Sequence, residues 1–126
     1  MKKIIITLIC SCFALSIYAQ QTKPAKKITV TKLERKISRK IQLVDVRTAK
    51  EFKEDHIGNA INIDVNSPDF EAKLQQLQKN KRVYVYCRSG KRSAIALKKM
   101  DSLGFNKVYN LQVGIEGWNT QKKKMN

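Results

Sequence analysis

Short β-prone runs alternate with helix signals along most of this chain, and no other feature constrains its fold as strongly. The β-prone runs cover residues 28–30, 41–46, 60–63, 83–86 and 107–111. The helix signals lie near residues 31–39, 48–55, 67–77, 93–103 and 115–121. Strands that are separated by helices favour a parallel sheet with helices on both of its faces. We therefore predict an α/β fold with a central five-stranded, mainly parallel sheet.

Local capping patterns predict where three of these helices begin. Thr31 and Thr48 are each followed three residues later by a glutamate, Glu34 and Glu51, which is the capping-box pattern. The pair Ser67–Pro68 joins a side chain that caps helices to a residue favoured in the first helical turn. These patterns predict helix starts at three positions.

The first residues have the layout of a secretory signal peptide. Lys2 and Lys3 precede an uncharged and mostly apolar run over residues 4–17, and Ala19 offers a small residue for cleavage. The run is shorter than the roughly 20 residues that a membrane-spanning helix needs. We predict a protein that is periplasmic or secreted after cleavage, with no stable insertion in the membrane.

The remaining sequence is expected to form one domain, because 126 residues are too few for two separate cores. Residues 1–19 are predicted to be the signal peptide, and the polar residues 20–27, which include Pro24, a tether. The domain is expected over residues 28–121. The lysine-rich residues 122–126 are expected to be a solvated basic tail.

The three cysteines divide between the leader and the domain. Cys10 and Cys12 lie in the predicted leader, so Cys87 would be the only cysteine of the mature chain. Proteins of oxidising compartments usually pair their cysteines, and an unpaired one is either a buried bystander or a reactive thiol. A lipoprotein that is anchored through Cys12 is the alternative to a cleaved leader.

The net charge of +16 favours small anions as ligands. Nucleic acid is disfavoured as a partner, because the chain is predicted to be exported and has no aromatic-interleaved basic strand or recognition helix. No cluster of histidine, cysteine or carboxylate residues has metal-ligand spacing, so we predict no metal and no cofactor.

The segment around Cys87 carries the clearest chemical signal. A β-prone run leads into Cys87, a short loop over residues 88–92 follows, and a helix is predicted to begin near Ser93. Ligands of open α/β sheets bind at the carboxyl ends of strands, and helix N-termini favour anions. The helix terminus and the basic loop should therefore favour the Cys87 thiolate, and Gly90 should let the loop turn its amides inward.

Three segments of the chain, in this order, resemble the single-domain rhodaneses, thiosulfate sulfurtransferases and their relatives. They are LVDVRTAKEFKEDHIGNAINI at residues 43–63, CRSGKRS at residues 87–93 and LQVGIEGW at residues 111–118. The resemblance implies a three-layer α/β/α domain. The chain departs from the family pattern at Asp55, Gly58, Asn59 and Val113, which bears on substrate preference more than on the fold.

The resemblance also implies covalent sulfur transfer through Cys87. The Cys87 thiolate would attack the outer sulfur of thiosulfate or a similar donor, and cyanide or a thiol would later remove the sulfur from the persulfide. A protein acceptor is a further option. Arg88 and Arg92 are the main candidates for binding the anionic donor, and Lys91 is a third. The complete substrate-binding loop is expected to comprise Arg88, Ser89, Gly90, Lys91, Arg92 and Ser93.

Other functions are open for the same loop. A non-catalytic persulfide relay or binding module would use Cys87 in the same way. A phosphatase or arsenate reductase is disfavoured, because four residues separate Cys87 from Arg92 whereas the related enzymes have five before their phosphate-binding arginine. A thioredoxin-like role is disfavoured too, because Cys87 has no second cysteine in a Cys-x-x-Cys spacing.

The remaining candidate residues receive structural roles. Asp45 and Arg47 are expected to support the site by fixing loops, and Glu51 to support its helix start and to pair with Arg47. His56 is expected to be structural, because an ionised thiol needs no general base. The aromatic side chains expected in the core are Tyr84, Tyr86 and Trp118.

Overall fold

The structure, a computed structural model, describes residues 26–126. Its strands are β1 (Lys26–Ile28), β2 (Gln42–Asp45), β3 (Ile61–Asn62), β4 (Val83–Tyr86) and β5 (Val108–Leu111). Its helices are α1 (Val30–Ile37), α2 (Ala49–Glu54), α3 (Phe70–Lys73), α4 (Lys91–Ser102) and α5 (Gly114–Met125), with a 3-10 turn, η1, at Leu74–Gln76. The predicted leader, most of the predicted tether, Cys10 and Cys12 lie outside the described residues.

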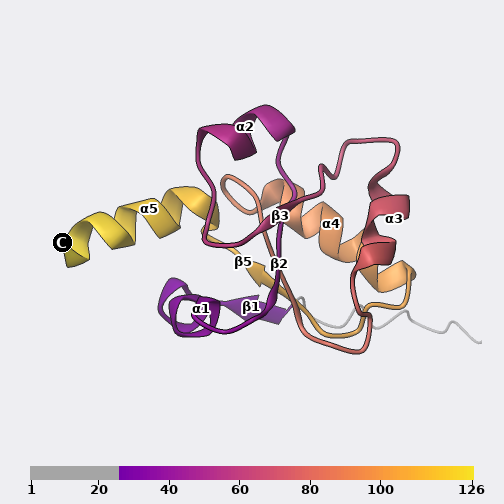
Figure 1. Ribbon diagram of the computed structural model, residues 1–126, viewed down its shortest axis with the longest axis horizontal. Coiled ribbons are helices and arrows are strands. Elements are labelled where there is room, and N and C mark those ends of the chain that lie inside the picture. Colours follow the sequence, from indigo (N-terminus) through magenta and orange to yellow (C-terminus); the bar gives the residue numbers. More distant parts are fainter. Residues whose placement is uncertain (1–25) are drawn as a thin grey trace, which may run out of the picture.

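All five strands pair in parallel in the order β1-β5-β4-β2-β3, which confirms the predicted sheet (Figure 1). Asp45 at the end of β2 pairs with Tyr86 at the end of β4. The backbone N–H of Val46 then donates to the carbonyl of Tyr86 over 3.0 Å. The two central strands therefore end level with each other, and Cys87 follows at that edge of the sheet.

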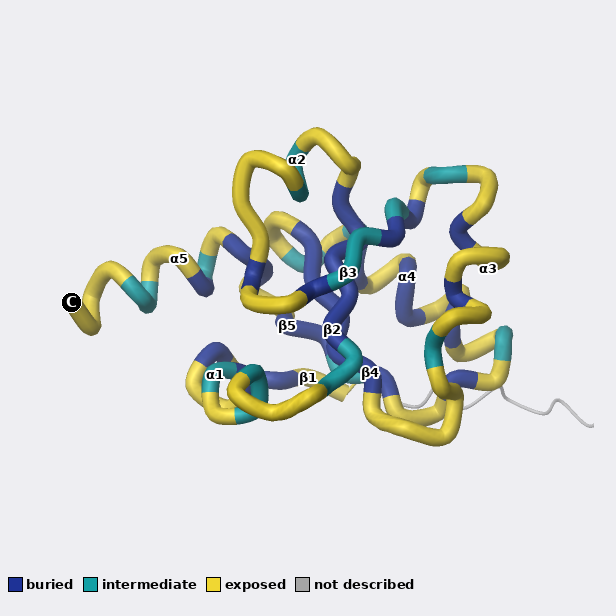
Figure 2. Tube along the Cα trace, in the orientation of Figure 1, coloured by how far each residue is buried: buried dark blue, intermediate teal, exposed yellow. Residues whose placement is uncertain are grey.

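Both faces of the sheet are buried, so the domain has three layers (Figures 1 and 2). Val83 and Val85 point into one apolar cluster, together with Phe70 of α3 and residues of α4. Tyr84 and Tyr86 point into the other, with residues of α1 and α5. Side chains of a strand alternate between faces, so β4 contributes to two cores at once.

The first strand and the first helix both begin earlier in the chain than predicted. Thr29, rather than Thr31, is the N-cap of α1, and its hydroxyl accepts a hydrogen bond from the backbone N–H of Lys32 over 3.3 Å. This start puts Val30 in the helix, where it is buried, so the preceding strand has to end at Ile28. The predicted capping box at Thr31 is wrong, because burial of the apolar helix face decides where the helix begins.

The other two predicted helix starts have different outcomes. The capping box at Thr48 is confirmed: its hydroxyl accepts from the backbone N–H of Glu51, whose carboxylate accepts from the backbone N–H of Thr48. The predicted helix start at Ser67–Pro68 is wrong, because α3 begins at Phe70 after Asp69. The Ser67 hydroxyl donates to the Asp69 carboxylate instead, and the carbonyl of Ser67 closes a turn with the backbone N–H of Phe70.

The lysine-rich residues 122–126 were predicted to be a solvated tail; residues 123–126 are exposed, but helix α5 continues through this segment to Met125. Helix α5 continues to Met125 because contacts with α1 hold its second half. Lys122 forms an ion pair with Glu34, and the side-chain amide of Gln121 donates to the Thr31 hydroxyl over 2.9 Å. The Lys122 ammonium also lies 5.8 Å from the centre of the Trp118 ring. Within residues 26–126, no helix is long and apolar enough to span a bilayer.

Candidate active site

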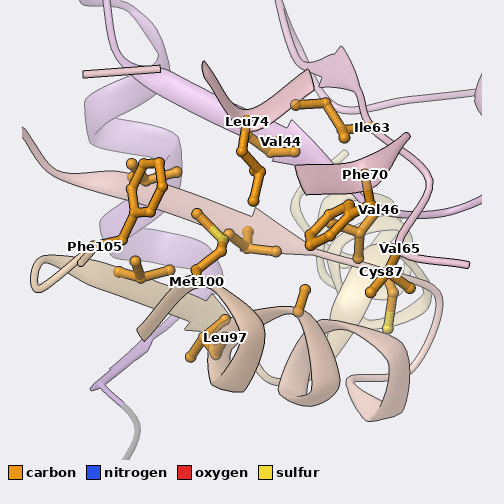
Figure 3. Packing of buried hydrophobic residues seen from close by; sticks show 14 residues of the cluster. Val44, Val46, Ile63, Val65, Phe70, Leu74, Cys87, Leu97, Met100 and Phe105 are labelled. Carbon is orange, nitrogen blue, oxygen red and sulfur yellow. The ribbon is translucent and has the colours of Figure 1, made fainter. Parts of the chain in front are cut away.

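Cys87 lies at the carboxyl end of the central strand β4 and directly before the loop that leads into α4. Its side chain is 1% exposed and belongs to the apolar cluster beneath α4. Figure 3 shows it at one end of that cluster, next to Val65 and away from Phe105. The thiol is therefore held between an apolar floor and the backbone at the start of α4.

Hydrogen bonds from the loop surround the sulfur. The backbone N–H of Gly90 donates to the Cys87 Sγ over 3.1 Å. The Ser93 Oγ lies 3.4 Å from the same sulfur and donates to the Gly90 carbonyl over 3.0 Å. A serine hydroxyl can rotate its single proton, so Ser93 can accept from a thiol and donate to a thiolate.

These contacts favour the thiolate form of Cys87. Burial alone would raise the pKa of the Cys87 thiol, because it disfavours the charged form. Hydrogen bonds from the Ser93 side chain and from the backbone of Ser93, Gly90 and Ser89 outweigh burial, so the pKa is lowered. The thiolate is thus stabilised mainly by loop hydrogen bonds, whereas the helix terminus and the basic side chains of the loop had been predicted to stabilise it.

Gly90 shapes the loop in two ways. Its φ of +101° is left-handed, a conformation that residues with a side chain rarely adopt. A Cβ at this position would also lie 2.3 Å from the Gln112 carbonyl oxygen. The predicted tight turn is confirmed, and it brings α4 forward so that the helix begins at Lys91 rather than near Ser93.

The start of α5 supports the loop from outside. The backbone N–H groups of Ile115 and Glu116 donate to the carbonyls of Cys87 and Arg88 over 2.9 and 3.2 Å. This approach requires Gly114, because a Cβ there would lie 2.1 Å from the Arg88 carbonyl oxygen. Sequence reasoning did not assign Gly114 a role. The position of Gly114 between a predicted strand and a predicted helix was the only hint in the sequence. Which backbone group approaches such a glycine depends on the fold.

Arg92 is paired with a carboxylate. Its Nη1 and Nη2 donate to the two Glu51 oxygens over 2.7 and 2.8 Å, and both side chains are 26% exposed. The hydrogen bond from Arg92 lowers the pKa of Glu51 to about 2, and contacts with Thr48 help. The predicted pairing of Glu51 with Arg47 is wrong, because Arg47 is occupied by Asp45 and Glu51 points toward α4.

Arg88 is paired as well, although in a more solvated setting. Its Nε donates to the Glu116 carboxylate over 2.7 Å, with side chains that are 67% and 55% exposed. Such exposed pairs are weak and are screened by salt. Both arginines that were predicted to bind an anion therefore face a carboxylate already. Among the described residues, Lys91 forms no ion pair.

Asp45 and Arg47 form a buried ion pair beside the site. Arg47 donates from Nε to both Asp45 oxygens and from Nη2 to one of them over 2.7 Å. The Arg47 Nη2 also donates to the Asp55 carbonyl over 2.7 Å, and the Asn62 amide donates to the carbonyls of Asp45 and Arg47. These bonds tie the segment after α2 to the end of β2.

The other candidate residues have structural surroundings. His56 stacks on Phe52 with ring centres 4.1 Å apart, and its Nδ1 lies 3.0 Å from the Phe52 carbonyl oxygen. The Tyr86 hydroxyl accepts a hydrogen bond from the backbone N–H of Ile57 over 2.9 Å. Tyr84, Tyr86 and Trp118 are buried, as predicted. In the part of the chain that the structure describes, no group of three or more acidic, histidine or cysteine residues could hold a metal ion.

A buried, hydrogen-bonded cysteine at the end of a central parallel strand and before a helix N-terminus has the surroundings that thiolate-based transfer or binding requires. The sequence profile of the rhodanese-like domain matches residues 29–121. The chain belongs to the rhodanese-like domain family.

Similar protein sequences support this family assignment. The chain is 34% identical to the "Putative sulfurtransferase YtwF" of Bacillus subtilis, over 80% of this chain and 97% of that protein. It is 36% identical to the thiosulfate sulfurtransferase GlpE of Coxiella burnetii, over 64% of this chain and 73% of that protein. It is 32% identical to the "Putative sulfur carrier protein YrkF" of Bacillus subtilis, over 62% of this chain but 41% of that protein.

The fold is shared with solved structures. A rhodanese-like domain protein from Staphylococcus aureus superposes with a TM-score of 0.66 at 32% identity, over 74% of this chain and 90% of that chain. A rhodanese-related protein from Thermoplasma volcanium gives a TM-score of 0.67 at 28% identity, over 76% of this chain and 92% of that chain. The predicted rhodanese-like α/β fold is confirmed.

Proposed function

We propose that this protein is a sulfurtransferase that carries sulfur on Cys87 as a persulfide. The proposal rests on the surroundings of the Cys87 sulfur. This atom accepts a hydrogen bond from the Gly90 N–H over 3.1 Å, and the pKa of the thiol is lowered. A thiolate is the form that attacks a sulfur donor. Relatives whose descriptions name sulfurtransferases support the same chemistry.

With thiosulfate as donor, the Cys87 thiolate attacks the outer sulfur. A bond forms between the two sulfur atoms, the bond from the outer sulfur to the sulfonate sulfur breaks, and sulfite leaves with that electron pair. The product is a persulfide anion on Cys87. Cyanide or a thiolate then attacks the outer persulfide sulfur, thiocyanate or a new persulfide leaves, and the Cys87 thiolate is restored.

The loop has a role in both half-reactions. The N–H groups that stabilise the thiolate are suited to a persulfide, which also carries negative charge. The Ser93 hydroxyl, 3.4 Å from the sulfur, can turn its proton from the Gly90 carbonyl toward that charge. We assign Ser93 to stabilising the anion, and the amides of Ser89 and Gly90 to the same task.

The experiment that tests the proposal is intact mass measurement of the purified protein before and after incubation with thiosulfate. We expect the mass of one sulfur atom to be added at Cys87 and to be removed by cyanide. Thiocyanate formation should be measured in the same samples. The proposal fails if no adduct forms with thiosulfate, with polysulfide or with a persulfide of a small thiol.

A non-catalytic sulfur relay is the second candidate. The pairing of Arg88 with Glu116 and of Arg92 with Glu51 leaves less free positive charge for a dianion such as thiosulfate. The relative YrkF carries the description "Putative sulfur carrier protein". A relay would form the persulfide stoichiometrically but would release thiocyanate slowly, whereas an enzyme would do both.

We also propose that the protein acts outside the cytoplasm, after cleavage of residues 1–19. The basic start, the apolar run over residues 4–17 and Ala19 support this proposal. N-terminal sequencing of the protein from its native cell should find a start near Gln20. A lipid on Cys12 would support the anchored alternative, and a cytoplasmic chain that keeps Met1 would refute export.

A further inference from the structure

A concave site lies at the opposite edge of the sheet from Cys87. It is a hollow of about 660 Å³ next to the amino ends of the strands. Gln42 begins β2, and Arg82 directly precedes β4. Cys87 follows the other end of β4, so the length of that strand separates the two sites by roughly 15 Å. In Figure 1, α1 and β1 border this edge, whereas α2 lies on the side of the Cys87 loop.

The hollow is lined by seven basic side chains and by no acidic one. They come from separate parts of the chain: Lys26 of β1, Lys36 of α1, residues 39–40 after α1, residues 81–82 before β4 and Lys107 before β5. Positive charge therefore converges on the hollow from several sides. Its summed field attracts anions.

None of these seven cations forms an ion pair within the described chain. Two of them donate to backbone carbonyls instead: Lys26 to Asn106 and Lys107 to Asn80, each over 3.3 Å. At the other edge of the sheet, Arg47, Arg88 and Arg92 each have a carboxylate partner. The fold thus pairs the arginines near Cys87 with carboxylates, whereas the seven cations of the hollow have no carboxylate partner among the described residues.

Hydrogen bonds of Gln42 and stacking of two tyrosine rings fix parts of the wall of the hollow. The Gln42 side-chain amide donates to the carbonyls of Gln78 and Arg82 over 3.1 and 3.3 Å, and its oxygen accepts from the Gln78 N–H over 2.7 Å. This bridge pins the loop before β4 to β2. On the sheet, Tyr84 stacks on Tyr109 with ring centres 5.5 Å apart. The Gln42 side chain therefore holds the loop that carries Lys81 and Arg82 against the sheet.

We propose that this hollow binds a small soluble anion that carries several phosphate groups. Clustered phosphates match cations that converge from several sides, and an arginine guanidinium can bind phosphate oxygens with two hydrogen bonds. The volume is that of a small-molecule site. A docked peptide would need apolar anchors, and the lining offers only Ile41 and two tyrosines, of which Tyr84 is buried. A bilayer surface is flat and would meet few of the cations inside a hollow.

The test uses the purified protein with inorganic tripolyphosphate as the probe, in isothermal titration and in backbone amide NMR. The test variant is Arg39→Gln with Arg82→Gln, and the matched control is Lys98→Gln with Lys124→Gln, which removes the same charge from exposed positions outside the hollow. We expect one saturable site whose affinity falls about tenfold or more in the test variant and less than about twofold in the control. Amide shifts should map to the loops before β4 and β5.

Two further variants make the result independent of folding and of sulfur chemistry. Lys36→Gln with Lys81→Gln removes charge from two other elements of the hollow and should weaken binding in the same way. Cys87→Ser should bind tripolyphosphate as tightly as the parent protein. Absence of saturable binding, equal weakening in the control, or binding only to phosphatidylglycerol vesicles or to an oligonucleotide would overturn the proposal.

Discussion

Glu51 and Arg92 join the first turn of α2 to the first turn of α4 through two parallel hydrogen bonds of 2.7 and 2.8 Å. This pair has two consequences for the site. It holds the helix start that faces Cys87, and it neutralises an arginine that could otherwise bind an anionic donor. Separate measurements can distinguish the two effects.

Replacing Glu51 by Gln should improve the use of thiosulfate. The change keeps the size of the side chain but frees the Arg92 charge, so we expect KM for thiosulfate to fall about two- to fivefold with little change in kcat. KM for an uncharged persulfide donor should not fall. The exposed Glu71→Gln of α3 is the charge-matched control. An equal fall in both variants would mean that net charge, not Arg92, is responsible.

The same ion pair should make the free energy of unfolding depend on pH. The pKa of Glu51 is lowered to about 2 in the folded protein, so the stabilisation is present above the ordinary glutamate pKa of about 4.3 and is lost as the pH falls toward 2. After discounting for solvent screening, we expect the free energy of unfolding of the parent protein to be about 1 kcal/mol larger than that of Glu51→Gln near pH 7. Urea unfolding at several pH values should show this gap closing below about pH 4. A gap that widens with acid would contradict the assignment.

Replacing Ser93 by Ala should raise the pKa of the Cys87 thiol. Among the hydrogen bonds that oppose the effect of burial, the one with the Ser93 hydroxyl lowers the thiol pKa most. The pH profile of alkylation by iodoacetamide should therefore move to higher pH. Ser89→Ala is the matched control, because Ser89 acts through its backbone and should leave the midpoint unchanged. Identical profiles for the parent and Ser93→Ala would remove Ser93 from the site.

Replacing Cys87 by Ser should abolish both the sulfur adduct and thiocyanate formation. The serine hydroxyl is similar in size but is not ionised near neutral pH, so it cannot act as the carrier. The fold should persist, as judged by circular dichroism and by the melting temperature. The assignment of Cys87 is wrong if the variant makes thiocyanate at the parent rate or if the adduct maps to another residue.

Replacing Gly114 by Ala should destabilise the protein by about 2–4 kcal/mol, because the new Cβ would lie 2.1 Å from the Arg88 carbonyl oxygen and φ is +62°. Gly104→Ala is the matched control. Its φ of +90° is also left-handed, but a Cβ there would meet nothing within 4 Å, so we expect a loss of about 1 kcal/mol. Equal losses in chemical denaturation would show that strain alone, not contact with the Cys87 loop, accounts for Gly114.

Much of this architecture follows from local sequence patterns. Strand β4 has its predicted bounds, and the capping box at Thr48 forms as predicted because both of its partners lie within one helical turn. The loop after Cys87 was recognisable for the same reason: its strand, its glycine and its helix are contiguous. At α1 the local sequence was ambiguous, because either Thr29 or Thr31 could cap the helix. The helix begins after Thr29, which places Val30 in its first turn, where it is buried.

The sequence alone was enough to predict the parallel α/β sheet, the position of Cys87 at its carboxyl edge and the excess of positive charge. The pairing of that charge depends on the three-dimensional fold. The ion pair of Glu51 with Arg92 spans 41 positions and that of Glu34 with Lys122 spans 88, so no local pattern could predict either. Lys26, Arg82 and Lys107 meet in one hollow because parallel strands bring their amino ends to the same edge of the sheet.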